Sequence, residues 1–470
     1  MTPGRSARLA AGAALAAAPT LAFAQAAQDK DLDLIPQTPA VAAPAAAAGA
    51  PGRTLYLEDA LTVAGRRGRL LVPPPGAPAS TWVDRLFLDT RATTPLRPDL
   101  TFAFSGRANL RAQDGVAFPS RQMFRLDLRE AYLSWSPRDG QYLDVGRINL
   151  KSGVALGYNP SDFFKTRAVA EVLSSDPSVL REGRLGALMV RGQVVWPRLA
   201  ATLAYAPRLY DPTPIYSGAN LPSLDPTLDR TNAADRLLLK ADVKLTDDLS
   251  PEALLYSEDG RTRYGLNLTA GLGRSTVVYA EWAGGRQADL ISEAAAYGRQ
   301  TGTIPRRAPA VLAGDPRLRF RNDLSLGGAY TTASKIVFNL EYHYHEAGFS
   351  ADDWRRWFAA GEAARGVPGV RAQLWYIRAY AADRQEPLSR HSAFLRVDRA
   401  DAFVRDLELS GFVSVDLQDG SGAAQVATDY FLSSRVTVGA LVFATFGDRR
   451  SDLGSGPQAV SVLLKLARYF

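Results

Sequence analysis

The chain has 470 residues, of which 46% are hydrophobic and 22% are charged, and it contains no cysteine. The missing cysteines exclude disulfides, thiolate metal sites and cysteine-based catalysis. The formal net charge is +7, but basic residues are scattered among acids, so the composition does not predict nucleic-acid binding.

The N-terminal residues have the pattern of a secretion signal. Arg5 and Arg8 precede an Ala/Leu-rich stretch that ends in a small-x-small cleavage site at Ala22–Ala24. The stretch is too short for a permanent membrane helix. We therefore expect residues 1–24 to be a removable signal peptide. Residues 25–52 are rich in Ala and Pro and cannot bury a core, so we interpret them as a disordered periplasmic leader and the place where a periplasmic partner would bind.

From residue 53 onward, short segments alternate apolar and polar residues with the period of a β-strand. The clearest are 237–245, 264–272, 320–330 and 407–416. Tight turns and long connections follow one another through much of the chain, which is typical of a barrel with periplasmic turns and extracellular loops. Residues 53–470 are therefore predicted to form one all-β domain, a transmembrane antiparallel β-barrel of about 16–18 strands.

The spacing of aromatic residues supports a membrane barrel over a soluble sandwich. Phe320 and Tyr330 lie on one face of a predicted strand, ten positions apart. On a tilted strand that separation is about 25 Å along the membrane normal, as expected for two aromatic girdles.

Several segments are ambiguous. The first strand is expected within Arg66–Val72, while helical spacing in Leu57–Ala64 predicts a periplasmic helix or a plug in the lumen. Arg371–Ala382 and Ser392–Arg399 are candidate strands, although an even strand number requires one candidate to be a loop. Aromatic spacing in Asp352–Ala364 predicts a short loop helix that packs on the barrel rim.

A glycine-rich connection follows the strand that ends at Gly146-Arg147. It contains the run Asn159-Pro160-Ser161-Asp162, in which Asn-Pro starts a turn that the aspartate side chain can close. The stretch resembles one found in porin-like and exporter-like barrel families of Proteobacteria. The charged loop is predicted either to fold inward and constrict a pore or to remain a solvated surface loop. Its candidate constriction residues are Asn159, Asp162, Lys165 and Arg167.

The final strand, Val460–Phe470, has one apolar face that is broken only by Arg468. It resembles the closing strand of Gram-negative outer-membrane β-barrels, whose C-terminal aromatic residue is read by the barrel-assembly machinery. The resemblance implies that Phe470 is an assembly signal and that the chain resides in the outer membrane, surrounded by lipid.

Polar positions that alternate with apolar ones are expected to face a wet lumen, because unpaired charges are not tolerated in a packed core. These candidate pore-lining residues are Arg125, Asp127, Arg129, Lys240, Asp242, Lys244, Arg263, Arg319, Arg321, Asp323, Glu408 and Asp416. Basic residues outnumber acids in this set, which favours anionic or polyhydroxylated solutes.

Catalytic and metal-binding patterns are weak. His343 and His345 share a strand face with Glu341, which would suit a metal ion, but lumen-facing polar residues give the same pattern and are favoured. His391 stands beside Ser389 without an Asp or Asn to orient it, so we expect neither an enzyme nor a cofactor. The sequence thus predicts a porin-like channel for small hydrophilic solutes. The alternatives are a dedicated export barrel for a polysaccharide or secreted product and, less favoured, a lipid-modifying enzyme; the oligomeric state is left open.

Overall fold

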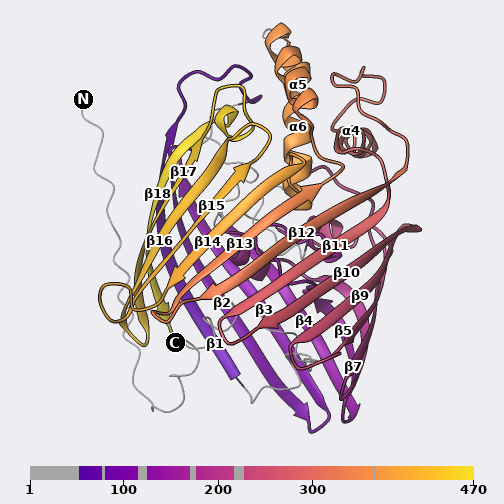
Figure 1. Cartoon of the computed structure of the whole chain (residues 1–470), viewed down its shortest axis with the longest axis vertical. Coiled ribbons are helices and arrows are strands. Elements are labelled where there is room, and N and C mark those ends of the chain that lie inside the picture. The colour runs from indigo at the N-terminus through magenta and orange to yellow at the C-terminus, as the bar shows by residue number, and fades with distance from the viewer. Residues whose placement is uncertain (1–51, 77–79, 115–123, 170–175, 216–226, 365–366) are drawn as a thin grey trace, which may run out of the picture. The chain divides into compact units, whose positions relative to one another are not determined.

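The computed structural model describes residues 52–76, 80–114, 124–169, 176–215, 227–364 and 367–470. Within them, eighteen strands each pair antiparallel with the next, and β1 also pairs with β18, so the sheet closes into a barrel (Figure 1). The predicted all-β barrel and its upper strand number are confirmed. The predicted signal peptide and nearly all of the leader lie outside the described residues.

The first four strands have 14–16 residues, whereas β5 to β8 have only 8–10. They are β1 (Gly52–Arg66), β2 (Trp82–Arg97), β3 (Leu100–Gln113), β4 (Phe124–Arg138), β5 (Gln141–Ile148), β6 (Ala187–Trp196), β7 (Leu199–Ala206), β8 (Arg236–Val243), β9 (Leu249–Glu258), β10 (Arg261–Leu272), β11 (Thr276–Gln287), β12 (Arg319–Thr331), β13 (Ile336–His345), β14 (His391–Arg399), β15 (Leu407–Asp416), β16 (Gly422–Ser433), β17 (Val436–Phe446) and β18 (Gln458–Tyr469).

The barrel closes along the β1–β18 seam, where Tyr56 lies opposite Tyr469 and Val63 opposite Val462. The start of β1 and the end of β18 are therefore at the same end of the barrel, which we call the turn end. The backbone N–H of Phe470 donates to Leu55 O across this seam. The opposite end is called the loop end.

Alternation along the strands separates an apolar outer surface from a polar interior. On β18, Val462, Leu464 and Leu466 are exposed on the outside, while Ser461 and Ala467 are buried inside. A closed barrel with an apolar outer band is suited to lipid, because its backbone polar groups are all paired within the sheet. None of the described helices is long and apolar enough to cross a membrane.

Connections at the two ends differ in length, as predicted. Turns at the turn end are short, including 197–198 between β6 and β7 and 434–435 between β16 and β17. Long connections at the loop end include 149–186, 207–235, 288–318 and 346–390. The alternation has exceptions at the loop end, since β9 and β10 are joined by only two residues and β15 and β16 by a short turn.

Three sequence-based predictions were wrong. Leu57–Ala64 is neither a helix nor a plug but part of β1, because Leu57, Leu61 and Val63 also satisfy the period of a strand between β18 and β2. The first strand accordingly precedes Arg66–Val72 instead of lying within it. Arg371–Ala382 is helical, whereas Ser392–Arg399 belongs to β14 as expected.

Short helices occupy the long connections. They are the single-turn η1 (Phe163–Lys165) and η2 (Leu453–Ser455) and the α-helices α2 (Pro177–Glu182), α3 (Leu228–Thr231), α4 (Leu290–Gln300), α5 (Ala351–Ala363) and α6 (Pro368–Arg384). The predicted loop helix is α5, which begins with a capping box between Ser350 and Asp353.

The helices α4, α5 and α6 form a helical cap at the loop end (Figure 1). Trp354, Trp357 and Phe358 of α5 are buried in an apolar cluster with residues of α4 and α6. Val72 and Ile215, from two other long connections, join the same cluster. The cap is thus held by its own hydrophobic core, separate from the polar interior of the barrel.

Candidate functional site: the barrel lumen

The inward faces of β2, β3 and β4 concentrate basic side chains. Their outward neighbours, such as Leu86, Leu110 and Phe124, are exposed on the outer surface, which fixes the alternate positions as lumenal. The inward arginines, which we call the arginine wall, are Arg85, Arg91, Arg107, Arg111, Arg125 and Arg129. The acids on or beside this face are Asp89, Asp127 and Glu130. The wall therefore has an excess of positive charge.

The acids of the wall are shared. Asp89 accepts hydrogen bonds of 2.6 Å from Nε and from Nη2 of Arg107, and Arg129 Nη2 approaches it to 3.2 Å. Asp127 accepts from Arg125 Nε at 2.6 Å and from Asn109 at 3.3 Å. Because each carboxylate already serves two donors, the positive excess is not neutralised within the wall.

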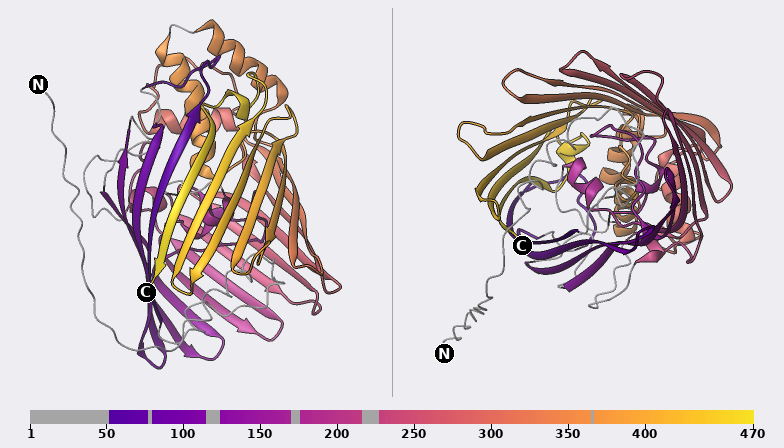
Figure 2. Two further views of the ribbon diagram at one scale, coloured as in Figure 1. Left: turned by 90° about the vertical axis from the view of Figure 1, so that its left-hand side faces the viewer. Right: turned by 90° about the horizontal axis from the view of Figure 1, so that it is seen from below.

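In the connection between β5 and β6, the described residues 149–169 and 176–186 lie inside the ring of strands and are called the inner loop (Figure 2). Ser325 Oγ on β12 donates to Tyr158 O at 2.5 Å, and the Phe163 ring stacks on Tyr256 of β9 with centroids 4.6 Å apart. Of the two alternatives that the sequence left open, the structure therefore has the loop folded into the lumen.

All four candidate constriction residues are buried. Asn159 Nδ2 donates to Ser152 O at 2.8 Å, and Asp162 accepts from Arg184 Nη1 at 2.5 Å. Lys165 Nζ donates to Asn159 O at 2.6 Å and lies 4.3 Å from the centroid of the Tyr158 ring. These contacts hold the loop in a compact form of its own.

Arg167 and the end of α6 tie the inner loop to the helical cap. The Arg167 guanidinium lies 3.4 Å from Asp383, and the Gln385 side chain donates to Lys165 O at 2.5 Å. Arg230, before β8, also donates to Asp383 at 2.7 Å. Three long connections thus meet at one point inside the barrel.

This meeting point carries ionisable groups of both signs. Burial lowers the pKa of the Lys165 ammonium to about 8. Burial alone would raise the pKa of Glu386, but nearby Arg384, His345 and Lys165 hold it at about 2. Glu386 is therefore ionised at any physiological pH, while Lys165 titrates just above neutrality.

The structure brings together some of the predicted pore-lining residues. Lys240 reaches Glu252 at 2.7 Å and Asp242 at 3.3 Å, and Arg263 pairs with Asp323 at 2.7 Å. These side chains project inward from β8, β9, β10 and β12, so much of their charge is compensated by oppositely charged side chains on the same group of strands.

Other predicted residues lie toward the barrel ends. At the loop end, Arg319 and Arg321 approach Asp315 at 3.2 and 4.0 Å. Lys244 lies near the turn end and pairs with the exposed Asp247 at 2.8 Å. The two remaining residues are on β15, where Glu408 is near the turn end and Asp416, near the loop end, accepts a hydrogen bond from Ser389.

The three histidines and Ser389 have separate partners. His343 Nε2 lies 2.7 Å from Glu341, and His345 Nδ1 lies 2.7 Å from Asp323, both inside the barrel. Ser389 bonds inside to Asp416, whereas His391 faces outward and contacts Tyr342 OH at 2.8 Å. Among the described residues, no group of three or more His, Asp or Glu side chains is arranged to hold a metal ion.

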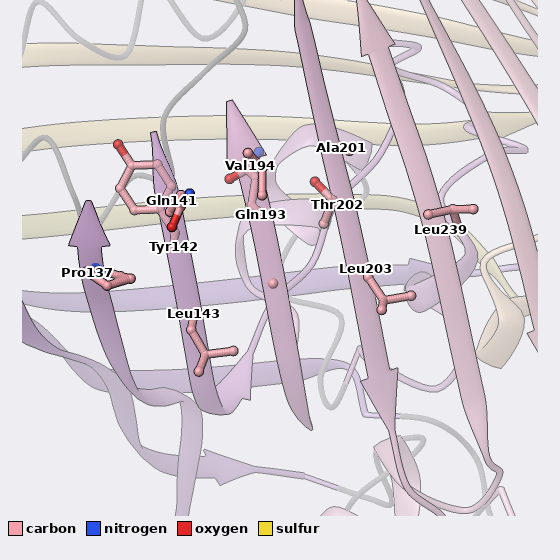
Figure 3. A pocket seen from close by; sticks show the side chains of 11 residues that line it. Pro137, Gln141, Tyr142, Leu143, Gln193, Val194, Ala201, Thr202, Leu203 and Leu239 are labelled. Atoms are coloured by element: carbon pink, nitrogen blue, oxygen red, sulfur yellow. The ribbon is translucent and has the colours of Figure 1, made fainter. Parts of the chain in front are cut away.

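A shallow, mainly apolar pocket lies on β4 to β8 (Figure 3). Leu143, Leu203 and Leu239 line it and are exposed on the outer surface. Nothing lies within 4 Å of the place where a Cβ on Gly192 would be, so the missing side chain leaves a hollow. It is a dent in the lipid-facing surface and not a place for a hydrophilic solute.

No family model and no curated protein sequence matches the chain. Among solved structures, it is similar to OccK11 (OpdR) of Pseudomonas aeruginosa, with 12% identity over 89% of this chain and 95% of that one, and a TM-score of 0.46. It is also similar to the outer membrane protein OprD from Pseudomonas aeruginosa, with 12% identity, 89% and 94% coverage and a TM-score of 0.45. A triple mutant of the Rhodopseudomonas blastica porin has 10% identity, 90% and 100% coverage and a TM-score of 0.39.

Sequence reasoning missed most of the arginine wall and several carboxylates. The four arginines of β2 and β3 were not singled out, although they alternate with outward residues in long segments: Arg85, Arg91, Arg107 and Arg111. Asp89 on β2 and Glu281 on β11 were missed as well. The same period-two pattern could have found all six.

Proposed function

We propose that the protein is an outer-membrane channel through which small hydrophilic solutes pass, with a preference for anions. The observation that supports this most is the arginine wall, whose cations outnumber the acids on the same lumenal face. Fixed positive charge in a narrow, wet bore concentrates anions and excludes cations. Surrounding lipid and assembly by the barrel-assembly machinery through Phe470 belong to the same proposal. The export alternative depends on a partner of residues 25–52, nearly all of which lie outside the described chain.

The test is ion selectivity in a planar lipid bilayer. Under a salt gradient, the wild-type channel should give a reversal potential of the sign set by anion permeation. The preference should be strong at low salt and weak at 1 M, where the screening length falls to about 3 Å. Replacing Arg91 and Arg111 with Gln should move the reversal potential toward the cation side, because it removes two guanidinium groups that are positively charged at neutral pH.

The control is Arg274→Gln, which removes an exposed charge from the turn between β10 and β11. It should leave the reversal potential close to that of the wild type. A folded barrel without conductance, or one whose selectivity ignores Arg91 and Arg111, would rule out the proposal.

A further inference from the structure

The inner loop is attached to the barrel by an unusual set of hydrogen bonds. Four consecutive backbone N–H groups, those of residues 154–157, all donate to two carboxylates that face the lumen from β11 and β13. Val154 N and Ala155 N donate to Glu281 Oε1, the latter at 2.6 Å. The next two, on residues 156 and 157, donate at 2.6 and 2.8 Å to the two oxygens of Glu341.

Both carboxylates are fully enclosed. Glu281 on β11 is 0% exposed and Glu341 on β13 is 1% exposed. Burying a carboxylate is costly unless hydrogen bonds replace its water, so the loop N–H groups stabilise it and it fixes them in turn. Further donors complete the arrangement: Tyr279 OH donates to Glu341 at 2.5 Å, and Ser161 Oγ donates to Glu281 at 3.3 Å.

The charged groups near the pair are few. His343 Nε2 lies 2.7 Å from Glu341, on the same strand. Arg181, in α2, donates to Ser152 O and Gly153 O at 3.0 and 2.7 Å, next to Glu281. No Lys or Arg nitrogen is among the donors recorded for either carboxylate in the described residues, so the attachment is made mainly of loop backbone.

The loop sequence is fitted to this attachment. Gly153 has a φ of 72°, and a Cβ there would lie 2.5 Å from both oxygens of the Glu281 carboxylate. A Cβ on Gly157 would lie 2.6 Å from the His343 ring and 2.8 Å from Phe394. Glycine is therefore required at both ends of the attached segment.

We propose that Glu281 and Glu341 are positioning residues that latch the inner loop against β11–β13 and so keep the rest of the lumen clear. Without the latch, the loop backbone would move into the bore beside the arginine wall. The attachment of the loop by these two carboxylates does not depend on what the protein transports; only its consequence for transport rests on the proposed function.

The direct test is limited proteolysis of the folded barrel. Lys165 and Arg167 are each 5% exposed, so trypsin should cut the wild-type inner loop slowly. The double variant Glu281→Gln/Glu341→Gln keeps the side-chain volume but removes both negative charges and replaces one accepting oxygen of each carboxylate with an NH2 donor. Cleavage after Lys165 or Arg167 should then be at least about tenfold faster.

The matched control is Glu252→Gln. Glu252 is a buried carboxylate on β9 that bonds to Lys240 of β8 and Asn267 of β10, and none of its hydrogen bonds within the described residues goes to the inner loop. Folding of every variant is checked by heat-modifiable mobility. If the double variant does not assemble, Glu281→Gln alone is judged by the same criterion. Equal cleavage of the latch variant and of Glu252→Gln would overturn the proposal.

Single-channel recording separates the latch from the channel proposal. In the latch variant, the current should show frequent brief closures that are absent in the wild type and in Glu252→Gln. If the wild-type loop resists trypsin but the wild-type barrel conducts no current, the latch proposal is supported and the channel proposal is contradicted. A conducting variant with faster cleavage but steady current would remove the role of the latch in keeping the bore clear.

Discussion

The two sides of the lumen use buried charge in different ways. On β2–β4, arginines outnumber carboxylates and two of them share Asp89, so positive charge is left over for the bore. Half the ring away, on β11–β13, Glu281 and Glu341 are occupied by backbone N–H groups of the inner loop. The first side acts on solutes directly, whereas the second acts on the loop that limits the space for them.

The difference shows that a lumenal charge cannot be counted toward selectivity from its sign alone. A carboxylate surrounded by three donors, as Glu281 is, or by four, as Glu341 is, is screened from a passing ion, whereas a guanidinium that shares its partner still presents N–H groups. Of the predicted pore-lining residues, Arg125 and Arg129 belong to the first kind of side. Lys240 and Arg263 are closely paired and should contribute less.

The largest effect is expected from Asp89→Asn. The change leaves the buried guanidinium groups of Arg107 and Arg129 without the carboxylate that they share. Breaking a buried ion pair on one side should cost about 3 kcal/mol of unfolding free energy. Denaturant unfolding of the refolded barrel, followed by tryptophan fluorescence, measures this, and the anion preference should increase in the same protein.

The control for Asp89→Asn is Asp429→Asn on β16. Asp429 also pairs with a lumenal cation, Lys465 at 2.8 Å, but both side chains are about one-quarter exposed. Exposed pairs contribute about 1 kcal/mol or less. Equal losses for the two variants would mean that the arginine wall is as well solvated as the rest of the lumen.

A medium effect is expected from Gly157→Ala on the other side. The added Cβ would meet His343 and Phe394 at less than 3 Å, and overpacking of this kind costs about 1–3 kcal/mol. Gly192→Ala on the outer surface is the control, since nothing lies within 4 Å of its Cβ position. The unfolding free energies of the two variants, obtained from denaturant unfolding curves, are compared with that of the wild type. A stable Gly157→Ala barrel with slow tryptic cleavage would show that the loop does not approach the wall so closely.

The sequence was sufficient for the barrel because alternation is a local property. Each strand shows its two faces in its own residues, as Leu237, Leu239 and Lys240 do on β8. It misled where two periods coincide: Leu57, Ala60, Leu61 and Ala64 fit a helix, but β18 and β2 on either side make the segment a strand.

The lumen was less predictable, because its contacts join residues far apart in the chain. Nothing in the local sequence of Glu281 indicates that it binds the N–H groups of residues 154 and 155, which precede it by 127 and 126 positions. Gly153 and Gly157 were visible in the sequence, yet the side chains that require glycine there became known only from the structure.

The smallest effect concerns Lys165, which lies where the inner loop meets the end of α6. Because burial lowers its pKa to about 8, about nine-tenths of these side chains are charged at pH 7 and about one-tenth at pH 9. Loss of this cation as the pH rises should reduce the anion preference slightly, with the midpoint near pH 8. The unfolded chain holds the proton up to higher pH, so the same shift should make folding more favourable between pH 8 and the ordinary lysine range.

Reversal potentials between pH 7 and pH 9 test this, with two substitutions as references. Lys165→Arg keeps a charge that does not titrate, so its selectivity should stay at the high value throughout. Lys165→Gln should stay at the low value, and the wild type should move from one to the other. If the wild-type reversal potential does not change between pH 7 and pH 9 while the two variants differ from each other, the pKa of Lys165 lies outside this range. Three identical, flat curves would mean that its charge does not reach the bore, and the arginine wall alone would then set the selectivity.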